Sequence, residues 1–187
     1  MHAVPRSIAQ PTRRESLMPR RRQSFEPGHA RKFLVVVDET PECDRALYYA
    51  ARRASRTGGG VVMLTVMDLA DASSQWLGVG DLMRAEASEQ ANARLEHFAA
   101  RVRRLSGVEP ERVLREGKVA DEVVRLIEAD EDIAILVLAA ATGSEGPGPL
   151  IAALASGSAA HGAWPRLLVP ITLVPGSLTD DEIDALA

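Results

Sequence analysis

The sequence predicts an α/β fold: a single doubly wound, five-stranded parallel sheet with helices on both faces, of the Rossmann-like kind. Short, continuously apolar runs rich in β-branched residues, such as KFLVVVD (32–38) and IAILVLAA (133–140), are typical of strands buried on both faces. Runs of this kind alternate with helical patterns along the chain. That alternation indicates βαβ units, which build a parallel sheet with right-handed crossovers.

The first half of the domain is expected to contain two strands and two helices. After the strand at 32–38, Thr40 is a candidate N-cap for a helix that ends at Gly58-Gly59-Gly60. VVMLTVMD (61–68) is the second apolar strand, and a long amphipathic helix follows from about 81 to 105. The apolar stripe of this helix consists of Ala91, Leu95, Phe98, Val102 and Leu105.

The second half is expected to supply three more strands. ERVLREGK (111–118) alternates in polarity and predicts a shorter, more exposed strand, and a third helix with apolar positions over 120–127 leads to the strand at 133–140. VPITLVPG (169–176) is the last strand. Its two prolines cannot donate to a sheet ladder, so they limit it to an edge or an interface. TDDE (179–182) matches a capping box for a short terminal helix.

The chain is expected to divide into three parts. These are a disordered basic N-terminal tail over residues 1–30, the domain over 31–176, and a short C-terminal helical tail over 177–187. Hydrophobic residues make up 46% of the chain but aromatic residues only 4%, so the core must consist mainly of Val, Ile, Leu and Ala. Within the tail, RRES (13–16) and RRRQS (20–24) resemble the acceptor sites of basophilic protein kinases, but matches this short are common by chance, and a solvated, flexible tail is the favoured interpretation.

Formal charge is unevenly distributed along the chain. Residues 1–30 hold six arginines and two glutamates, a charge of +4, so the remainder carries −8 in a chain of net charge −4. An acidic body offers no electrostatic footprint for nucleic acid, which could be bound only weakly, through the tail. The single cysteine, Cys43, excludes an internal disulfide and fits a reducing, cytoplasmic compartment. No run approaches the ~20 apolar residues that a membrane helix needs, so no membrane partner is expected.

A ligand site is expected at one edge of the sheet. In an open parallel sheet, ligands bind beyond the carboxyl ends of the strands, where the strand order reverses. The residues at three such ends are Asp38–Thr40, Val66–Asp68 and Ala141–Gly148. Between Arg125 and Arg166 there is no lysine or arginine. Phosphates bound there would therefore depend on backbone N–H groups, a helix N-terminus and a divalent cation.

Several stretches follow the order and spacing of a known family: FLVVVDETPECDRALYYAARRA, VVMLTVMD, REGKVADEVVRLIE, ILVLAAATGSEG and a final VPITLVPG. Together they resemble the universal stress protein family over residues 31–176. The resemblance implies a five-stranded α/β fold of the adenine-nucleotide α-hydrolase type and a non-catalytic role in the stress response. Some members of the family bind ATP and others do not.

The same resemblance implies where a second subunit and a nucleotide would bind. A homodimer would form through the last strand, at Ile171, Thr172, Leu173 and Val174. Asp38 stands where ATP-binding members contact the adenosine, and ATP with Mg²⁺ is the implied ligand. The implied nucleotide-binding residues are Asp38, Thr40, Val66, Gly143, Gly146, Gly148, Gly157 and Ser158.

The glycine-rich loop departs from the family's phosphate motif in its length. The motif has nine residues before its final Gly-Ser, and this chain has ten, from Pro147 to Ser156. Pro149 suits the first position of a helix. A helix that starts there puts Gly157 roughly 12 Å along the axis, too far to share the same phosphates. A helix that restarts near Ser156 would bring Gly157 back to them, and the sequence leaves both starts open.

The function hypotheses follow from these features. No nucleophile–base–orienter set and no metal-ligand spacing of Cys and His is visible in the sequence, so an enzyme is not expected. The leading hypothesis is a homodimeric stress-response protein that binds ATP beside Asp38. The alternative is an interaction or regulatory protein of the same fold that binds no nucleotide, because Leu150, Ile151 and Leu154 pack into the sheet and close the site. Slow ATP hydrolysis is a third hypothesis.

Overall fold

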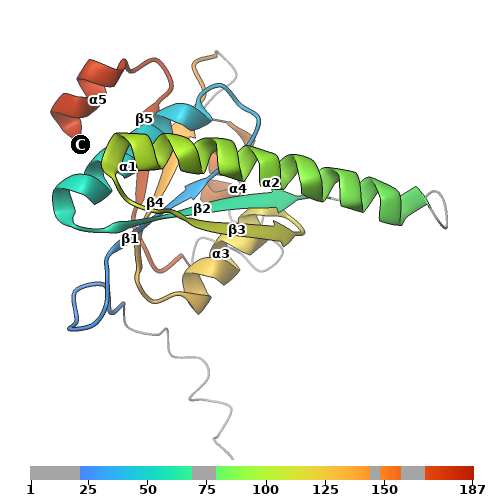
Figure 1. The fold of residues 1–187 in the computed structure, drawn as a ribbon, viewed down its shortest axis with the longest axis horizontal. Helices are drawn as coiled ribbons and strands as arrows, with labels where there is room; N and C mark the ends of the chain where they lie inside the picture. The colour runs from blue at the N-terminus through green and yellow to red at the C-terminus, as the bar shows by residue number, and fades with distance from the viewer. Residues whose placement is uncertain (1–21, 69–78, 144–147, 157–166) are drawn as a thin grey trace, which may run out of the picture.

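The computed structural model describes residues 22–68, 79–143, 148–156 and 167–187 (Figure 1). The strands are β1 (Lys32–Val36), β2 (Gly60–Met67), β3 (Glu111–Glu116), β4 (Ile133–Ala140) and β5 (Ile171–Pro175). The helices are α1 (Cys43–Thr57), α2 (Val79–Ser106), α3 (Val119–Ala129), α4 (Pro149–Ser156) and α5 (Asp180–Leu186). The strands form one parallel sheet in the order β3-β2-β1-β4-β5, which confirms the predicted fold.

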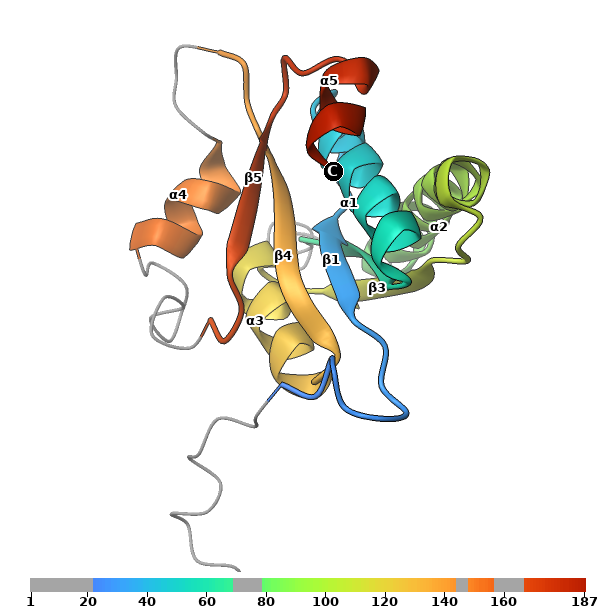
Figure 2. The same ribbon diagram turned by 90° about the vertical axis from the view of Figure 1, so that its left-hand side faces the viewer.

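The helices cover the sheet on both faces. Figure 2 shows α1, α2 and α5 on one side of the sheet and α3 and α4 on the other. Successive side chains of a strand point to opposite faces, so the central strand β1 contributes to both layers. Phe33 and Val35 pack with α1 and α2, whereas Leu34 packs with α3, and none of the three has any exposed surface.

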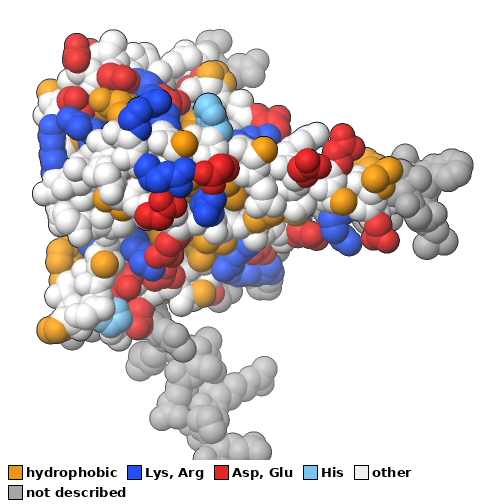
Figure 3. Space-filling view, viewed as in Figure 1, with side chains coloured by type: hydrophobic (Ala, Val, Ile, Leu, Met, Phe, Trp, Pro, Cys, Tyr) orange, Lys and Arg blue, Asp and Glu red, His pale blue; other side chains and the backbone are white. Residues whose placement is uncertain are grey.

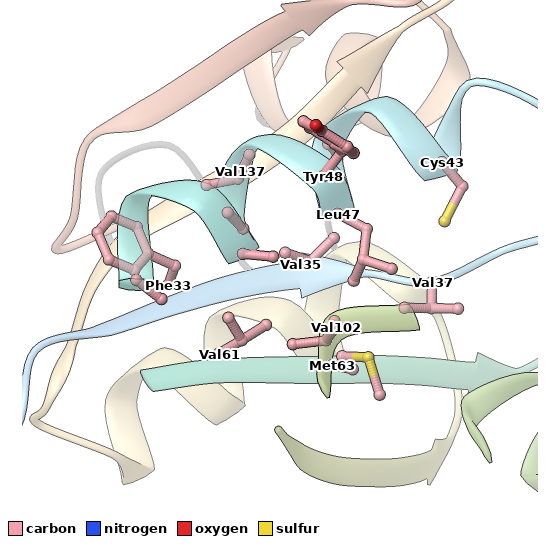
Figure 4. Packing of buried hydrophobic residues seen from close by; sticks show 14 of the residues in the cluster. Phe33, Val35, Val37, Cys43, Leu47, Tyr48, Val61, Met63, Val102 and Val137 are labelled. Carbon is pink, nitrogen blue, oxygen red and sulfur yellow. The ribbon is translucent and has the colours of Figure 1, made fainter. Parts of the chain in front are cut away.

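Small aliphatic side chains fill the layer beneath α1 and α2. Figure 4 shows Leu47 of α1 and Val102 of α2 lying over the strand residues Val35, Val61 and Met63. All five side chains are at most 1% exposed. The core is therefore built from aliphatic residues, as the low aromatic content predicts. On the outer face along α2, acidic and basic side chains lie interspersed (Figure 3).

The first helix starts later than its capping pattern predicts. Its N-cap is Glu42, without a side-chain cap, rather than Thr40. The hydroxyl of Thr40 instead donates to Oδ1 of Asp38 at 2.6 Å, and the carbonyl oxygen of Thr40 accepts from the N–H of Cys43 at 3.2 Å. Thr40 therefore stabilises the turn between β1 and α1, because its hydroxyl is committed to the end of the strand.

The last strand lies at the edge of the sheet, where the prolines place it. It pairs with β4 alone, from Leu136 opposite Ile171 to Ala140 opposite Pro175.

No described helix has the length and the apolar composition that crossing a membrane requires.

Residues before 31 already pack against the sheet and helices of the domain. Residues 22–30, which fall within the expected tail, lie against the body of the protein. Ser24 is only 7% exposed, and the guanidinium of Arg22 donates to carbonyl oxygens at the end of α3. Residues 1–21 of the expected tail, including the RRES stretch, lie outside the described residues.

The C-terminal helix is attached to the body by both apolar and ionic contacts. The predicted capping box is present: the Thr179 hydroxyl accepts from the N–H of Glu182 at 3.3 Å, and the Glu182 carboxylate accepts from the N–H of Thr179 at 2.8 Å. Arg45 and Arg52 of α1 pair with Asp180 and Asp184 of α5 at 2.6 and 2.5 Å. Beneath these pairs, Ile183 has no exposed surface and belongs to the main core. Residues 177–187 are thus packed as part of the domain.

Replacing Ile183, the residue that anchors α5 in the core, tests whether α5 is part of the domain. Ile183→Ala should lower the free energy of unfolding by about 2–5 kcal/mol, because it opens a cavity in the core. Leu186→Ala on the same helix is a matched control, because Leu186 is 63% exposed, and it should change stability by less than about 0.5 kcal/mol. Urea unfolding followed by circular dichroism measures both. Equal effects of the two variants would show that α5 is not part of the cooperative core.

Candidate functional site

A cavity of about 480 Å³ opens at the carboxyl ends of β1 and β2. The first turns of α3 and α4 form its other walls. The floor and walls include Val36 of β1, Val66 of β2, Ala120 of α3 and Leu150 of α4. This is the edge at which the order of the parallel strands reverses, since β1 is followed by β2 on one side and β4 on the other.

Asp38 stands at the mouth of this cavity, two residues after the end of β1. Its Oδ1 accepts two hydrogen bonds from Thr40, one from the backbone N–H at 2.9 Å and one from the hydroxyl at 2.6 Å. A short turn closed by its own carboxylate therefore holds Asp38 at the rim. A second, smaller cavity of about 120 Å³ lies alongside, and Asp38 lines both.

Four carboxylates and two cations line the larger cavity. The acidic residues are Asp38, Glu39, Asp68 and Asp121, and the basic residues are Arg94 and Lys118. Arg94 forms an ion pair with Glu39. The rim is therefore net negative, and an anionic ligand would need its charge reduced by a bound cation. Among the described residues, no three His, Cys, Asp or Glu side chains are grouped as metal ligands would be.

Of the two cations, Arg94 comes from a part of the chain that the sequence did not connect with the site, and Lys118 comes from the turn between β3 and α3. Arg94 belongs to the middle of α2, and Lys118 is the N-cap residue of α3. A partial signal exists for Arg94, because it precedes the buried Leu95 and so flanks the apolar stripe that faces the sheet. For Lys118 the signal is its position between a strand and a helix, where side chains reach the carboxyl edge of the sheet.

The glycine-rich loop enters α4 directly. Gly148 has φ +104°, a conformation that favours glycine, and its carbonyl oxygen accepts from the N–H of Ala152 at 3.1 Å. The helix starts at Pro149, which is the first of the two starts that the sequence leaves open. Leu154 of α4 is 1% exposed, yet the larger cavity stays open beside this helix.

The predicted site residues are only partly brought together. Asp38 and Val66 line the larger cavity, and Thr40 and Gly148 line the smaller one. Gly143 is exposed, with open space around its Cα, and lines neither cavity. Three further predicted residues lie outside the described residues: Gly146, Gly157 and Ser158.

Comparison with known proteins decides the family. A sequence model of the Universal stress protein family matches residues 29–170, from the segment before β1 to the residue before β5. The chain belongs to the universal stress protein family. This confirms the resemblance noted in the sequence, and α5 lies beyond the matched range. No curated protein sequence matches the chain.

Solved structures of universal stress proteins share the fold. The universal stress protein UspA from Lactobacillus plantarum has a TM-score of 0.62 at 14% identity, over 78% of this chain and 97% of that one. A universal stress protein in complex with cAMP has a TM-score of 0.56 at 16% identity, over 79% and 98%. The universal stress protein from Archaeoglobus fulgidus in complex with dAMP has a TM-score of 0.51 at 18% identity, over 77% and 97%. At these identities the similarity establishes the fold.

Cys43 lies behind the smaller cavity, in the first turn of α1. It is 2% exposed, and its Sγ donates to the carbonyl oxygen of Val36 at 3.7 Å. Burial raises the pKa of the thiol from its ordinary value of 9.0 to about 12. The thiol is therefore not activated, because the effect of burial on its pKa outweighs the hydrogen bond from the backbone of Asp38, which favours the thiolate.

The native protein should accordingly resist thiol-specific reagents. A pKa raised from 9.0 to about 12 lowers the thiolate fraction at pH 8 roughly a thousand-fold, and the thiolate is the reacting species. Labelling with a chromogenic disulfide should be negligible in buffer and complete in urea, with one thiol per chain, since Cys43 is the single cysteine. Rapid labelling of the folded protein would contradict this placement of Cys43.

Proposed function

We propose that the chain is a homodimeric, cytoplasmic stress-response protein that binds an adenine nucleotide in the larger cavity. The observation that carries the proposal is the cavity itself, about 480 Å³, at the switch point of a universal stress protein fold. Small-molecule sites typically have volumes of about 300–1,000 Å³ and mostly apolar walls. Val36, Val66 and Leu150 supply such walls here.

The residues of the cavity suit a nucleoside. A flat base can pack between the apolar side chains of β1, β2 and α4. Asp38, fixed at the rim by Thr40, offers a carboxylate that can accept hydrogen bonds from ribose hydroxyls. The complexes of universal stress proteins with cAMP and dAMP support an adenine nucleotide as the class of ligand.

The phosphate end of the cavity suits a ligand whose charge is partly neutralised. Arg94 and Lys118 are the two cations of the larger cavity, and Gly148 lines the smaller cavity alongside it, at the start of α4. Pro149, the first residue of that helix, has no N–H to donate. With four carboxylates nearby, a triphosphate would be accompanied by Mg²⁺, whereas a monophosphate or cyclic phosphate carries less charge to offset.

The proposed role is binding without turnover. No histidine or cysteine is among the described residues that line the larger cavity. The carboxylates of the rim can accept hydrogen bonds from a bound nucleotide, so the role we assign to the site is to sense that ligand. A protein of this fold that binds no nucleotide is the alternative, and the binding experiment decides between the two.

Calorimetric titration with Mg–ATP, cAMP and AMP tests nucleotide binding. At least one of these should bind saturably, and Asp38→Ala should weaken it about ten- to hundred-fold, because a hydrogen bond to a charged group contributes about 1.5–3 kcal/mol. Asp38→Asn should keep the hydrogen bonds from Thr40 that form the turn, but it removes the negative charge of the side chain. Asp181→Ala, which removes the same charge from the exposed first turn of α5, is the matched control. Absence of binding at millimolar nucleotide would favour the alternative.

The proposed homodimer forms through β5. The carbonyl of Pro170 and the N–H of Gly176 bond to Leu136 and Ala140 of β4, so the even-numbered residues face β4. By strand alternation, the backbone groups of Leu173 point to the open edge, and its side chain is 47% exposed. An antiparallel pair of these edges about a two-fold axis would satisfy those groups in both subunits.

Substitution by proline tests this interface. Leu173→Pro removes the outward N–H without removing a bond to β4, so the protein should stay folded and become monomeric. Leu173→Ala keeps the N–H and should remain dimeric. Sedimentation velocity at micromolar concentration distinguishes the two states. A monomeric wild-type protein would refute the dimer.

A further inference from the structure

The segment 22–31 is docked at the end of the sheet opposite the cavity. It leads into the amino end of β1, beside the turn that joins α3 to β4, and Figure 1 shows it in blue, folded along that end. Arg22 contacts the end of α3. Its Nη1 donates to the carbonyl oxygens of Ile127 at 2.6 Å and Asp130 at 2.7 Å. The guanidinium thus caps the C-terminus of α3, where the last carbonyl groups have no partner within the helix and the helix dipole is negative.

Two further bonds hold the segment against the same turn. The N–H of Gln23 donates to the carbonyl oxygen of Glu131 at 3.1 Å, and Nδ1 of His29 lies 2.5 Å from Oδ1 of Asp132. Ser24, between these contacts, is 7% exposed. We call residues 22–31 the strap. In the strap, Ser24 is buried and Arg22 is bound to the end of α3.

The turn that receives the strap is strongly acidic. It holds three carboxylates, those of Asp130, Glu131 and Asp132, and Glu128 in the last turn of α3 adds a fourth. Burial lowers the pKa of the Arg22 guanidinium, and the charges of Asp130, Glu131 and Glu128 oppose that shift. The docked state consequently depends on a positive segment meeting a negative turn. Over residues 22–31 the segment carries two arginines and one glutamate.

Ser24 also closes the motif Arg20-Arg21-Arg22-Gln23-Ser24. Arginines two, three and four residues before a serine are what the acidic substrate grooves of basophilic kinases bind. We propose that Ser24 is the phosphoryl acceptor of an arginine-directed Ser/Thr protein kinase, and that phosphorylation and docking of the strap exclude each other. Arg22 cannot cap α3 and occupy a kinase groove at the same time.

The transfer is the ordinary one with ATP as the co-substrate of the kinase. The Ser24 hydroxyl oxygen attacks the γ-phosphorus, the bond from that phosphorus to the bridging oxygen breaks, and ADP leaves. The hydroxyl proton passes to the catalytic base of the kinase. The buried hydroxyl of the docked strap cannot reach such a site, so the strap must first leave the acidic turn.

Phosphorylation then prevents the strap from returning. A phosphoserine carries about −1.5 to −2 charges at pH 7. That charge would lie near these acidic residues, in a position where the serine is 7% exposed. Like-charge repulsion and desolvation both oppose docking, so the modified segment stays released until a phosphatase removes the group. This control of the strap by phosphorylation does not depend on nucleotide binding, because the strap lies at the amino end of β1 and the cavity lies at the carboxyl ends of the strands.

The test uses the full chain, Mg–ATP and the catalytic domain of a basophilic protein kinase. Tandem mass spectrometry locates the phosphate, and hydrogen exchange follows the peptide over 22–31. Ser24 should be modified, and Ser24→Ala should abolish that modification. Asp132→Asn, which weakens docking but leaves every arginine of the motif in place, should be phosphorylated several-fold faster. Asp181→Asn, a distant loss of the same charge, should match the wild-type rate.

Phosphorylated protein should exchange faster over 22–31, and phosphatase treatment should restore the original protection. Three results would each overturn the proposal. These are an unmodified Ser24, equal phosphorylation rates for Asp132→Asn and wild type, or unchanged exchange after phosphorylation.

Discussion

Burial of the central strand on both faces is the constraint from which the rest of the structure follows. Phe33, Leu34 and Val35 are fully buried, so helices must cover both sides of β1, and each connection to a neighbouring parallel strand must carry one. Strands then add on either side of β1, which gives the order β3-β2-β1-β4-β5. The strand order reverses beside β1, and Asp38 emerges where β1 ends. The position of the cavity is therefore a consequence of how the core is buried.

The sequence predicts the elements well because their signals are local, and fails where the deciding partner is distant. The apolar runs of β1 and β4 and the capping box at Thr179 depend on residues close together in the chain. Arg22 could not be assigned in that way, because its partners are the backbone carbonyls of Ile127 and Asp130. Every residue has such carbonyls, so no pattern of residue types marks them. An arginine-rich, proline-containing stretch is expected to be disordered on composition alone.

The residues of the candidate site show the same difference: those with local signals were predicted, and those with distant partners were not. Asp38 and Val66 were predicted because the carboxyl ends of parallel strands must meet at one edge. Arg94 was not predicted, because its position depends on how α2 is rotated and shifted on the sheet, which side-chain packing decides. The start of α4 at Pro149 was one of two possibilities, and the packing of Leu154 into the core favours it. Glycine spacing alone could not choose between them.

Helix α3 connects the two ends of the molecule physically. Arg22 caps its C-terminus, while Lys118 and Ala120 at its N-terminus line the cavity, about 16 Å away for eleven residues. Release of the strap removes a charged cap, which contributes about 0.3–2 kcal/mol to a helix end. Val123 and Ile127 remain fully buried against the sheet, so the helix cannot move freely. The part of the coupling between strap and cavity that passes through the Arg22 cap is therefore limited to about 2 kcal/mol.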